Sequence, residues 1–547
     1  MKNNSFILSH NNTINIFLVS AVLSFFLAFI AYGEFIISDM MIYDDTIYLS
    51  KSLLGFDISH KNSPLFFYMI EILSKFNSVV IFKIIWLMFH SCSSGLISAI
   101  ISKVTDSVWV PIMIGVLIGL IPIHEQAIIF ITGSHSTIGL TFLLLGFFTL
   151  IFSYQLSSWR FILANVGATL QFLVAAAITP TAFLTPLVSL FWLVIILFKR
   201  KKDYISIMLS FSFSLMPIIL VFALTGVGEY HYSNLVGWVD YSLSQIFQNL
   251  VKSTEMAFSF ITKAKGFTKA VYYTAFVTIL IIPIVHVFLN FKNLANYKST
   301  NNKKLITIIL FSIFISALTF APGSITTSIS SRYLVAPVVF ILIPIFLIYI
   351  GFLRHANKTL RVLFSTFLAV VIFLNFTQLS QVKIDYLRGF KNPHNQIKDL
   401  VIRENGTWGD GDSQIILLTN RLGSSPTMGF NHWSSWYLRY LTQKPNIIGL
   451  VGSPQRVTRS PFVVKYRDHG SEYWEVSHGR SKRIQMIGLE KSRKTFAYLQ
   501  DEDGRFNKID RIDFSTDELV KFVLFGESYE KPLQIQSTEF FLWPSDK

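Results

Sequence analysis

The most constraining feature of this sequence is a succession of long apolar runs joined by polar connections. A helix needs about 20 apolar residues to cross the hydrocarbon core of a membrane, where every backbone polar group must be satisfied internally. Of these runs, the third is short, and the fifth and sixth are separated only by a Thr-Pro-Thr hinge at residues 179–181. The sequence predicts about eleven spans, at residues 14–37, 79–102, 107–123, 138–154, 161–178, 182–198, 205–225, 270–290, 305–321, 334–353 and 362–377.

The composition agrees with a membrane protein. Hydrophobic residues make up 52% of the chain and charged residues only 14%, and the mean hydropathy is +0.50. These values are too apolar for a soluble protein of this size. The first run is too long for a signal-peptide core and has no small-residue cleavage site directly after it, so we expect it to remain as a transmembrane helix. Cys92 is the only cysteine, which excludes a disulfide within the chain.

The lysines and arginines that adjoin the predicted spans agree with one orientation of the chain. The net charge is +15, which in a soluble chain would suggest nucleic acid but in a membrane protein marks cytoplasmic connections facing anionic lipid. The basic residues on that side are Lys2, Lys103, Arg160, Lys199, Arg200, Lys201, Lys202, Lys292, Lys298, Lys303, Lys304, Arg354, Lys358 and Arg361. We therefore expect no nucleic-acid partner, a cytoplasmic N-terminus, and extracytoplasmic positions for residues 38–78, 124–137, 226–269, 322–333 and the C-terminal tail.

The tail differs in composition from the rest of the chain. Residues 378–547 carry charges of both signs and turn signals such as Gly-Asp-Gly. Short apolar runs at 415–419 and 447–451 are typical of strands between polar loops. The sequence therefore predicts two domains, a transmembrane module over residues 1–377 and a mixed α/β domain over 378–547 on the outer side.

Two long outer connections contain aromatic residues among polar ones. This pattern is typical of short amphipathic helices that lie in the membrane interface. We expect the connections at 38–78 and 226–269 to border a groove for a lipid. The aromatic residues are Tyr43, Tyr48, Phe56, Phe66, Phe67 and Tyr68 in the first and Tyr230, Tyr232, Trp238, Tyr241 and Phe247 in the second.

Three aspartates follow the first apolar run directly. Asp39, Asp44 and Asp45 lie just beyond the predicted outer end of that span. Carboxylates at a membrane boundary are poor anchors, and ionisable groups there indicate function by default. We take them as candidates for a catalytic general base. The alternative is a solvated loop in which Asp44 or Asp45 caps a short helix.

A second polar cluster lies between the third and fourth spans. His124, Glu125 and His135 occur in an otherwise apolar stretch, and we expect them to orient a substrate. Binding of a divalent cation is an alternative, although the spacing matches no standard metal site. Simple solvation at the interface is a third interpretation.

A basic residue opens the tenth span on the outer side, against the positive-inside trend. Arg332 and Tyr333 precede Pro337 there. The planar, permanently charged guanidinium suits a phosphate group, so we expect Arg332 to bind one and to stabilise its departure. The alternative is an interfacial anchor whose head reaches the membrane surface.

The tail also contains an aromatic and basic run between residues 431 and 440. Such side chains stack on sugar rings, which indicates binding of an acceptor glycan, but they are equally common in the core and rim of a small domain. The residues concerned are Trp433, Trp436, Tyr437 and Arg439.

Together these pieces resemble the GT-C superfamily of glycosyltransferases that use polyprenyl-phosphate sugars. The resemblance is carried by the acidic first outer loop, the segment 122–135, and Arg332-Tyr333 before a late span. Within the superfamily the chain looks most like the serotype-converting glucosyltransferases of bacteria and their phages, which modify O-antigen, a part of lipopolysaccharide. The Trp-Trp-Asp signature of oligosaccharyltransferases is absent.

The resemblance implies a bacterial inner-membrane enzyme that moves a sugar, glucose in the first instance, from undecaprenyl phosphate to O-antigen or a similar glycan on the periplasmic side. It also implies inversion at the anomeric carbon without a covalent sugar-enzyme intermediate. Two alternatives remain at this point. One is an O-antigen polymerase, and the other is a transporter or flippase of lipid-linked sugar that performs no chemistry.

Overall fold

The computed structural model divides into two compact units. The helical unit comprises residues 1–38, 59–73 and 80–382, and the second unit comprises residues 39–58, 74–79 and 383–547. The residues that the structure describes are 10–38, 44–55, 58, 63–76, 78–105, 107–121, 132–154, 156, 158–199, 204–225, 248–249, 251–252, 255, 266, 269–274, 300–324, 334–355, 358–386, 392–409, 413–418, 437–452, 462–468, 472–478, 494–501, 503, 505–508 and 534–536.

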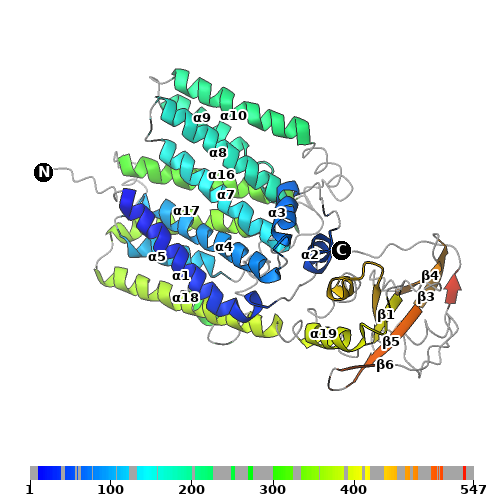
Figure 1. Cartoon of the computed structure of the whole chain (residues 1–547). Coiled ribbons are helices and arrows are strands. Elements are labelled where there is room, and N and C mark those ends of the chain that lie inside the picture. The colour runs from blue at the N-terminus through cyan, green and yellow to red at the C-terminus, as the bar shows by residue number, and fades with distance from the viewer. Residues whose placement is uncertain are drawn as a thin grey trace. The chain divides into compact units, whose positions relative to one another are not determined.

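The helical unit is a bundle of long apolar helices whose axes run roughly alongside one another (Figure 1). Most of them coincide with the predicted spans, because length and apolarity alone determine where such a helix forms. The helices are α1 (His10–Ile36), α3 (Pro64–Ser74), α4 (Val79–Ser102), α5 (Trp109–Gly119), α7 (His135–Ser153), α8 (Ser158–Ile178), α9 (Leu187–Lys199), α10 (Tyr204–Thr225), α16 (Thr300–Ser324), α17 (Val335–His355) and α18 (Lys358–Tyr386).

Five segments of the described chain are long and apolar enough to cross a membrane. They are Asn12–Ile36, Val79–Ser102, His135–Ser153, Ser158–Ile178 and Arg361–Gln381, and shorter apolar helices accompany them. The prediction of a helical protein with several membrane spans is therefore confirmed. The predicted number of eleven stays a prediction, because most of the eighth span, 270–290, lies outside the described residues.

The sixth predicted span begins later than expected. The sequence predicted a helix from residue 182, but α9 starts at Leu187, directly after Pro186. Residues 180–182 instead form a single 3-10 turn, and Thr185 Oγ1 donates to the carbonyl of Ala182 at 2.6 Å. Proline fits the start of a helix but not its interior, so the chain turns between Pro180 and Pro186 before α9 begins.

Helices α1, α4 and α5 approach one another through small residues. A Cβ atom added to Gly115 of α5 would lie 2.0 Å from Ser98 Oγ and 2.8 Å from Ser20 Oγ. One turn further on, a Cβ atom on Gly119 would lie 2.1 Å from Ser94 Oγ. Small residues four positions apart leave the space that close backbone approach requires within a membrane. Only glycine therefore fits these two positions of α5.

Two lysines, one near each end of α4, show that α1 and α4 run in opposite directions. Lys83, near the start of α4, donates to carbonyls at the end of α1. Lys103, just after the end of α4, donates to the hydroxyl of Thr13 near the start of α1 at 3.1 Å. We call the two ends of the bundle the Lys83 end and the Lys103 end.

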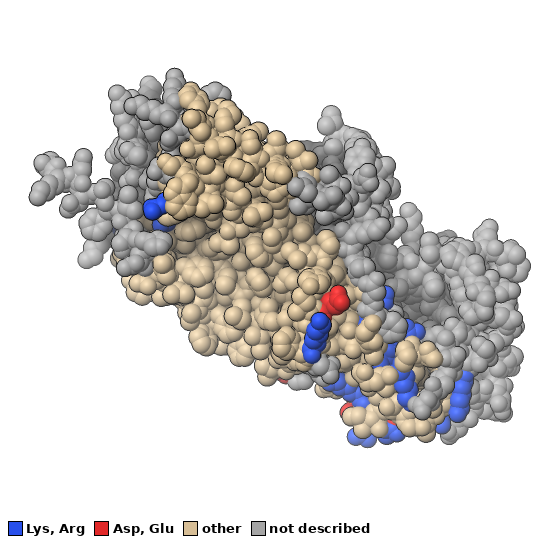
Figure 2. All heavy atoms as spheres, turned by 45° about the horizontal axis from the view of Figure 1, so that its top comes forward, with Lys and Arg blue, Asp and Glu red and all other residues tan. Residues whose placement is uncertain are grey.

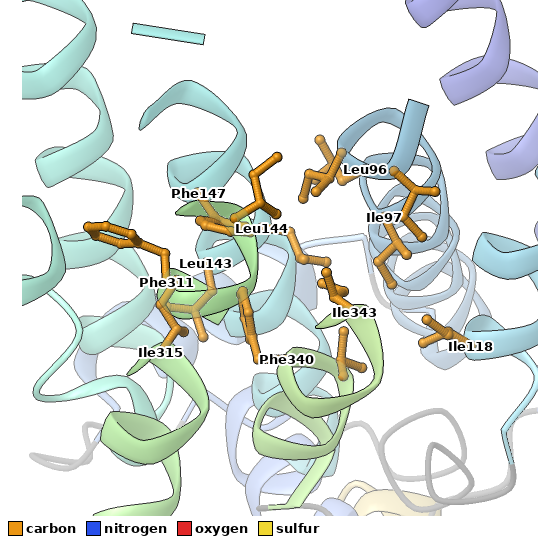
Figure 3. Packing of buried hydrophobic residues seen from close by; sticks show 14 of the residues in the cluster. Leu96, Ile97, Ile118, Leu143, Leu144, Phe147, Phe311, Ile315, Phe340 and Ile343 are labelled. Atoms are coloured by element: carbon orange, nitrogen blue, oxygen red, sulfur yellow. The ribbon is translucent and has the colours of Figure 1, made fainter. Parts of the chain in front are cut away.

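The hydrophobic core of the bundle includes the region where α17 packs against both α7 and α16. Phe147 of α7 and Phe340 of α17 meet with ring centroids 5.7 Å apart in an edge-to-face arrangement. Leu143, Phe311 and Ile343 pack into the same cluster, as Figure 3 shows. Aromatic pairs of this geometry add stabilisation beyond burial.

The flanks of the bundle are apolar, as membrane lipid requires. Figure 2 shows one face, on which the helical unit is almost entirely free of charged residues. Exposed tryptophans begin α5 and α8, with Trp109 exposed by 72% and Trp159 by 61%. Tryptophan at helix ends is typical of the boundary between membrane and water. The membrane boundary at the Lys103 end thus lies near these residues.

The second unit contains the described strands together with α2 (Asp44–Leu53), α19 (Asn392–Glu404) and a helical turn at residues 437–442. The strands predicted at 415–419 and 447–451 are found as β1 (Ser413–Leu418) and β2 (Ile448–Gly452). One sheet has the order β2-β1-β5-β6, in which β1 is parallel to β2 and β5, and the other has the order β4-β3-β7. The remaining strands are β3 (Phe462–Asp468), β4 (Glu472–His478), β5 (Lys494–Gln500), β6 (Phe506–Lys508) and β7 (Gln534–Gln536).

A buried hydrogen-bond chain supports the first sheet. Trp408 Nε1 donates to the hydroxyl of Tyr498 on β5 at 2.7 Å. That hydroxyl donates in turn to Glu404 Oε2 at the end of α19 at 3.3 Å. Burial raises the pKa of Tyr498 to about 12, because the ionised form loses its hydration there. The chain links α19 to the middle of the sheet.

Candidate functional site

A buried lysine holds the end of α1. Lys83 is only 2% exposed, and its Nζ atom donates to the carbonyl of Phe35 at 3.0 Å and to that of Ser38 at 2.9 Å. The same atom lies 4.0 Å from the centre of the Phe35 ring. The last carbonyls of a helix have no partner within the helix and carry the negative end of its dipole, so an ammonium group is well suited to them.

The bonds made by Lys83 reach the residue next to the first predicted aspartate. Ser38 precedes Asp39 in the sequence, and its hydroxyl also donates to the Phe35 carbonyl at 2.7 Å. The amide of Ile37 still donates to Gly33 in the helical pattern at 2.9 Å. The end of α1 is therefore well held up to the peptide that leads into Asp39.

An aromatic cluster at the Lys83 end joins three helices. Phe66 of α3 lies with its ring centroid 5.8 Å from that of Trp86 on α4 and 5.6 Å from that of His135 on α7. His135 is buried, with 6% of its surface exposed. Trp86 Nε1 and Ser136 Oγ are also buried, and neither has a hydrogen-bond partner among the described residues. Buried polar groups without partners are rare and are often found at functional sites.

The described residues include only some of the predicted site. His135 lies in the aromatic cluster just described. Asp44 and Asp45 are the first two residues of α2, where the positive end of a helix favours acidic side chains, in agreement with the interpretation as a helix start. The side chains of Asp44 and Asp45 lie outside the described part of the chain. The other predicted site residues lie outside it entirely, namely Asp39, His124, Glu125, Arg332, Tyr333, Trp433 and Trp436.

Two of the predicted acceptor-binding residues have structural contacts. The ring of Tyr437 is fully buried and lies 4.4 Å from that of His394, measured between centroids. Arg439 Nε donates to the carbonyl of Ile447 at 2.8 Å, just before β2. These contacts fit the interpretation of the run as the core and rim of a small domain, and acceptor binding stays a prediction.

Sequence reasoning missed Lys83. The signal was present, because Lys83 is the one Asp, Glu, Lys or Arg residue within the apolar run 79–102, and a charged residue in a membrane span indicates function. What the sequence alone lacked was the partner, since Ser38 lies 45 positions away.

No metal site is found among the described residues, since no three His, Cys, Asp or Glu side chains come close enough to share an ion. His124 and Glu125 are outside that part of the chain, so the predicted alternative of a divalent cation is untested.

No protein-family model matches the chain, and no curated protein is significantly similar to it in sequence.

Proposed function

We propose that this protein is an integral-membrane inverting glycosyltransferase that takes a sugar from a polyprenyl phosphate. The supporting observation is the arrangement at the Lys83 end. There a helix long enough to cross a membrane ends at Ile36, a buried lysine holds its last carbonyls, and a segment with three aspartates follows before α2 begins at Asp44. Acidic residues that follow a membrane span directly in the sequence are expected at the membrane boundary, which supports the proposal.

In the proposed reaction a hydroxyl oxygen of the acceptor attacks the anomeric carbon of the sugar. The bond from that carbon to the phosphate oxygen breaks, and the acceptor proton passes to Asp44 or Asp45. Arg332, with Tyr333, stabilises the phosphate that leaves. A single well-placed guanidinium is far more effective at a site shielded from water than in solution.

The remaining predicted residues have roles in binding. His135, at the start of α7 and against Phe66, would orient the sugar together with His124 and Glu125, because imidazole and carboxyl groups form directed hydrogen bonds with hydroxyls. Trp433, Trp436, Tyr437 and Arg439 of the tail would bind the acceptor glycan.

The proposed compartment is a bacterial inner membrane, with undecaprenyl phosphate as the carrier and O-antigen as the acceptor. The Lys103 end would then be cytoplasmic. Basic Lys103, Arg160 and Lys199 adjoin the helix ends there, as the positive-inside rule expects. The Lys83 end and residues 378–547, as a separate domain, would lie on the periplasmic side.

The decisive experiment is a transfer assay with purified protein in lipid. Radiolabelled polyprenyl-phosphate glucose and O-antigen lipid are incubated with the wild type, the double variant Asp44→Asn with Asp45→Asn, and Arg332→Gln. We expect transfer by the wild type and a loss of at least about 100-fold in both variants. Full transfer by both variants at equal protein would overturn the assigned roles. Movement of the lipid-linked sugar across vesicles without its consumption would favour a flippase instead.

A further inference from the structure

The first turn of α7 contains a buried serine whose hydroxyl has no hydrogen-bond partner among the described residues. Ser136 is the second residue of α7, and only 3% of its surface is exposed. Its Oγ atom is unpartnered in the part of the chain that the structure describes. A buried hydroxyl in this state costs free energy, and the service of a ligand is one explanation for such a cost.

A second unpartnered donor lies in the aromatic cluster that adjoins this turn. Trp86 of α4 is 1% exposed, and its Nε1 atom likewise has no partner within the described ranges. Its ring lies 5.8 Å from that of Phe66, which lies 5.6 Å from the ring of His135, the neighbour of Ser136 in the sequence. Packing around Phe66 therefore brings two buried donors from different helices to one end of the bundle.

The chemistry of this turn suits a negatively charged oxygen. The indole Nε1 group can only donate, and a serine hydroxyl can donate as well. In a helix the Cα–Cβ bonds tilt toward the N-terminus, so the side chain of Ser136 leans toward the start of α7. That end carries the positive pole of the helix dipole, where phosphate groups bind. The first turn of α7 contains no acidic residue that would neutralise it.

We propose that Ser136 Oγ and Trp86 Nε1 bind the phosphate of a polyprenyl phosphate at the start of α7. This inference rests on the proposed function, and it adds two residues to the site that holds the donor. Hydrogen bonds to a charged oxygen are strong where water is excluded, as it is around these two side chains.

The surroundings favour a phosphate that is carried by a lipid. Phe66 belongs to α3, a short apolar helix that also buries Phe67 and Ile70. The exposed face of α3 carries two further apolar side chains, Tyr68 and Ile72. Short helices with apolar side chains on the exposed face lie at the membrane interface. An isoprenoid chain attached to a phosphate at this site would therefore have apolar surface beside it.

The first test measures the binding of farnesyl phosphate, a short polyprenyl phosphate, to the full-length protein in detergent by titration calorimetry. We expect Ser136→Ala and Trp86→Phe each to weaken binding by about tenfold or more, the factor that loss of a hydrogen bond to a charged group gives. Farnesol, which lacks the phosphate, should bind equally to the wild type and to Ser136→Ala.

The chain offers a matched control for each variant. Ser312 on α16 is also fully buried, with an Oγ atom that lacks a partner among the described residues. Trp192 on α9 is buried as well, but its Nε1 atom donates to Ser153 Oγ at 3.3 Å. Ser312→Ala and Trp192→Phe should both leave the affinity for farnesyl phosphate unchanged.

The melting temperature of the ligand-free protein separates a binding role from a packing role. Ser136→Ala removes a buried hydroxyl that lacks a partner, so the melting temperature should stay the same or rise, as for Ser312→Ala. Weaker binding at an undiminished melting temperature would support a direct contact with the ligand. A lower melting temperature with unchanged affinity would overturn the proposal, because Ser136 would then serve packing.

The remaining outcomes distinguish this proposal from the proposed function. Binding of farnesyl phosphate that requires Ser136, in a wild type that transfers no sugar, would support the phosphate site and defeat the proposed function. Undiminished binding by Ser136→Ala and Trp86→Phe, in a protein that does transfer sugar, would overturn the site alone. Inorganic phosphate is the last probe. Binding of this ion that depends on Ser136 and is not displaced by farnesyl phosphate would overturn the assignment to a lipid phosphate.

Discussion

The Nζ atom of Lys83 donates a 2.9 Å hydrogen bond to the backbone carbonyl of Ser38. This bond joins the start of one membrane helix to the end of another at the point where the aspartate segment begins. A lysine that is 2% exposed is costly in a membrane unless its donors are satisfied. Here the end of α1 satisfies them, so the lysine and the helix end depend on each other.

The first prediction compares how much Lys83 and Lys103 contribute to stability. Lys83→Met should lower the free energy of unfolding by about 2–3 kcal/mol, because buried carbonyls lose a charged donor. Lys103→Met should cost about 1 kcal/mol, since Lys103 is only partly buried and its bond to Thr13 is to a side-chain hydroxyl. Melting temperatures in detergent, measured by size-exclusion chromatography after heating, would rank the variants. Equal melting temperatures would contradict this account of Lys83.

The second prediction concerns the contact of α5 with α1 and α4. Gly115→Ala and Gly119→Ala should each destabilise the protein by about 1–3 kcal/mol, because the new methyl group would lie within 2.1 Å of a serine Oγ. Gly167→Ala on α8 is the matched control, since a Cβ atom there meets nothing within 4 Å. That control should be neutral or stabilising by up to about 1 kcal/mol. The idea fails if all three variants behave alike in a thermal denaturation series.

The third prediction separates packing from chemistry at His135. His135→Phe retains a ring against Phe66 and should change stability by no more than about 1.5 kcal/mol. Transfer should nevertheless fall by about 100-fold if the imidazole orients the sugar. Phe66→Leu should show the reverse, a lower melting temperature with nearly normal turnover per folded molecule. Normal transfer by His135→Phe would restrict His135 to a packing role.

The fourth prediction is a loss of stability at high pH through Tyr498. The folded state keeps the phenol proton up to a pKa of about 12, whereas an unfolded tyrosine releases it near pH 10. Between these values the unfolded state binds fewer protons, so stability decreases as the pH rises from about 10 to about 12 and is unaffected by this group below that range.

Tyr498→Phe provides the measurement. At pH 8 the variant should be less stable by about 1–2 kcal/mol, because the buried Trp408 Nε1 loses its acceptor. The stability difference between wild type and variant should then shrink as the pH approaches 11. A difference that stays constant across this range, followed by circular dichroism of the full-length protein, would rule out titration of Tyr498 as a cause.

Helix positions followed from the sequence because their causes are local. An apolar run such as 79–102 has few alternatives to a membrane-length helix, and the structure has α4 at Val79–Ser102. The apolar runs at 415–419 and 447–451 similarly predicted β1 and β2. The late start of α9 also has a local cause, namely Pro180 and Pro186 just before it. Apolarity alone does not show that these prolines delay the start of the helix.

The sequence by itself determined that the chain is a membrane protein, since hydropathy is a sum over neighbouring residues. Only the tertiary structure decided which polar and aromatic side chains of different helices contact one another. The partners of Lys83 lie 48 and 45 positions away, and the ring contact of Phe66 with His135 spans two helices. Such pairs depend on how helices pack, and packing is set by shape complementarity among residues such as Gly115 and Ser98, which no local pattern encodes.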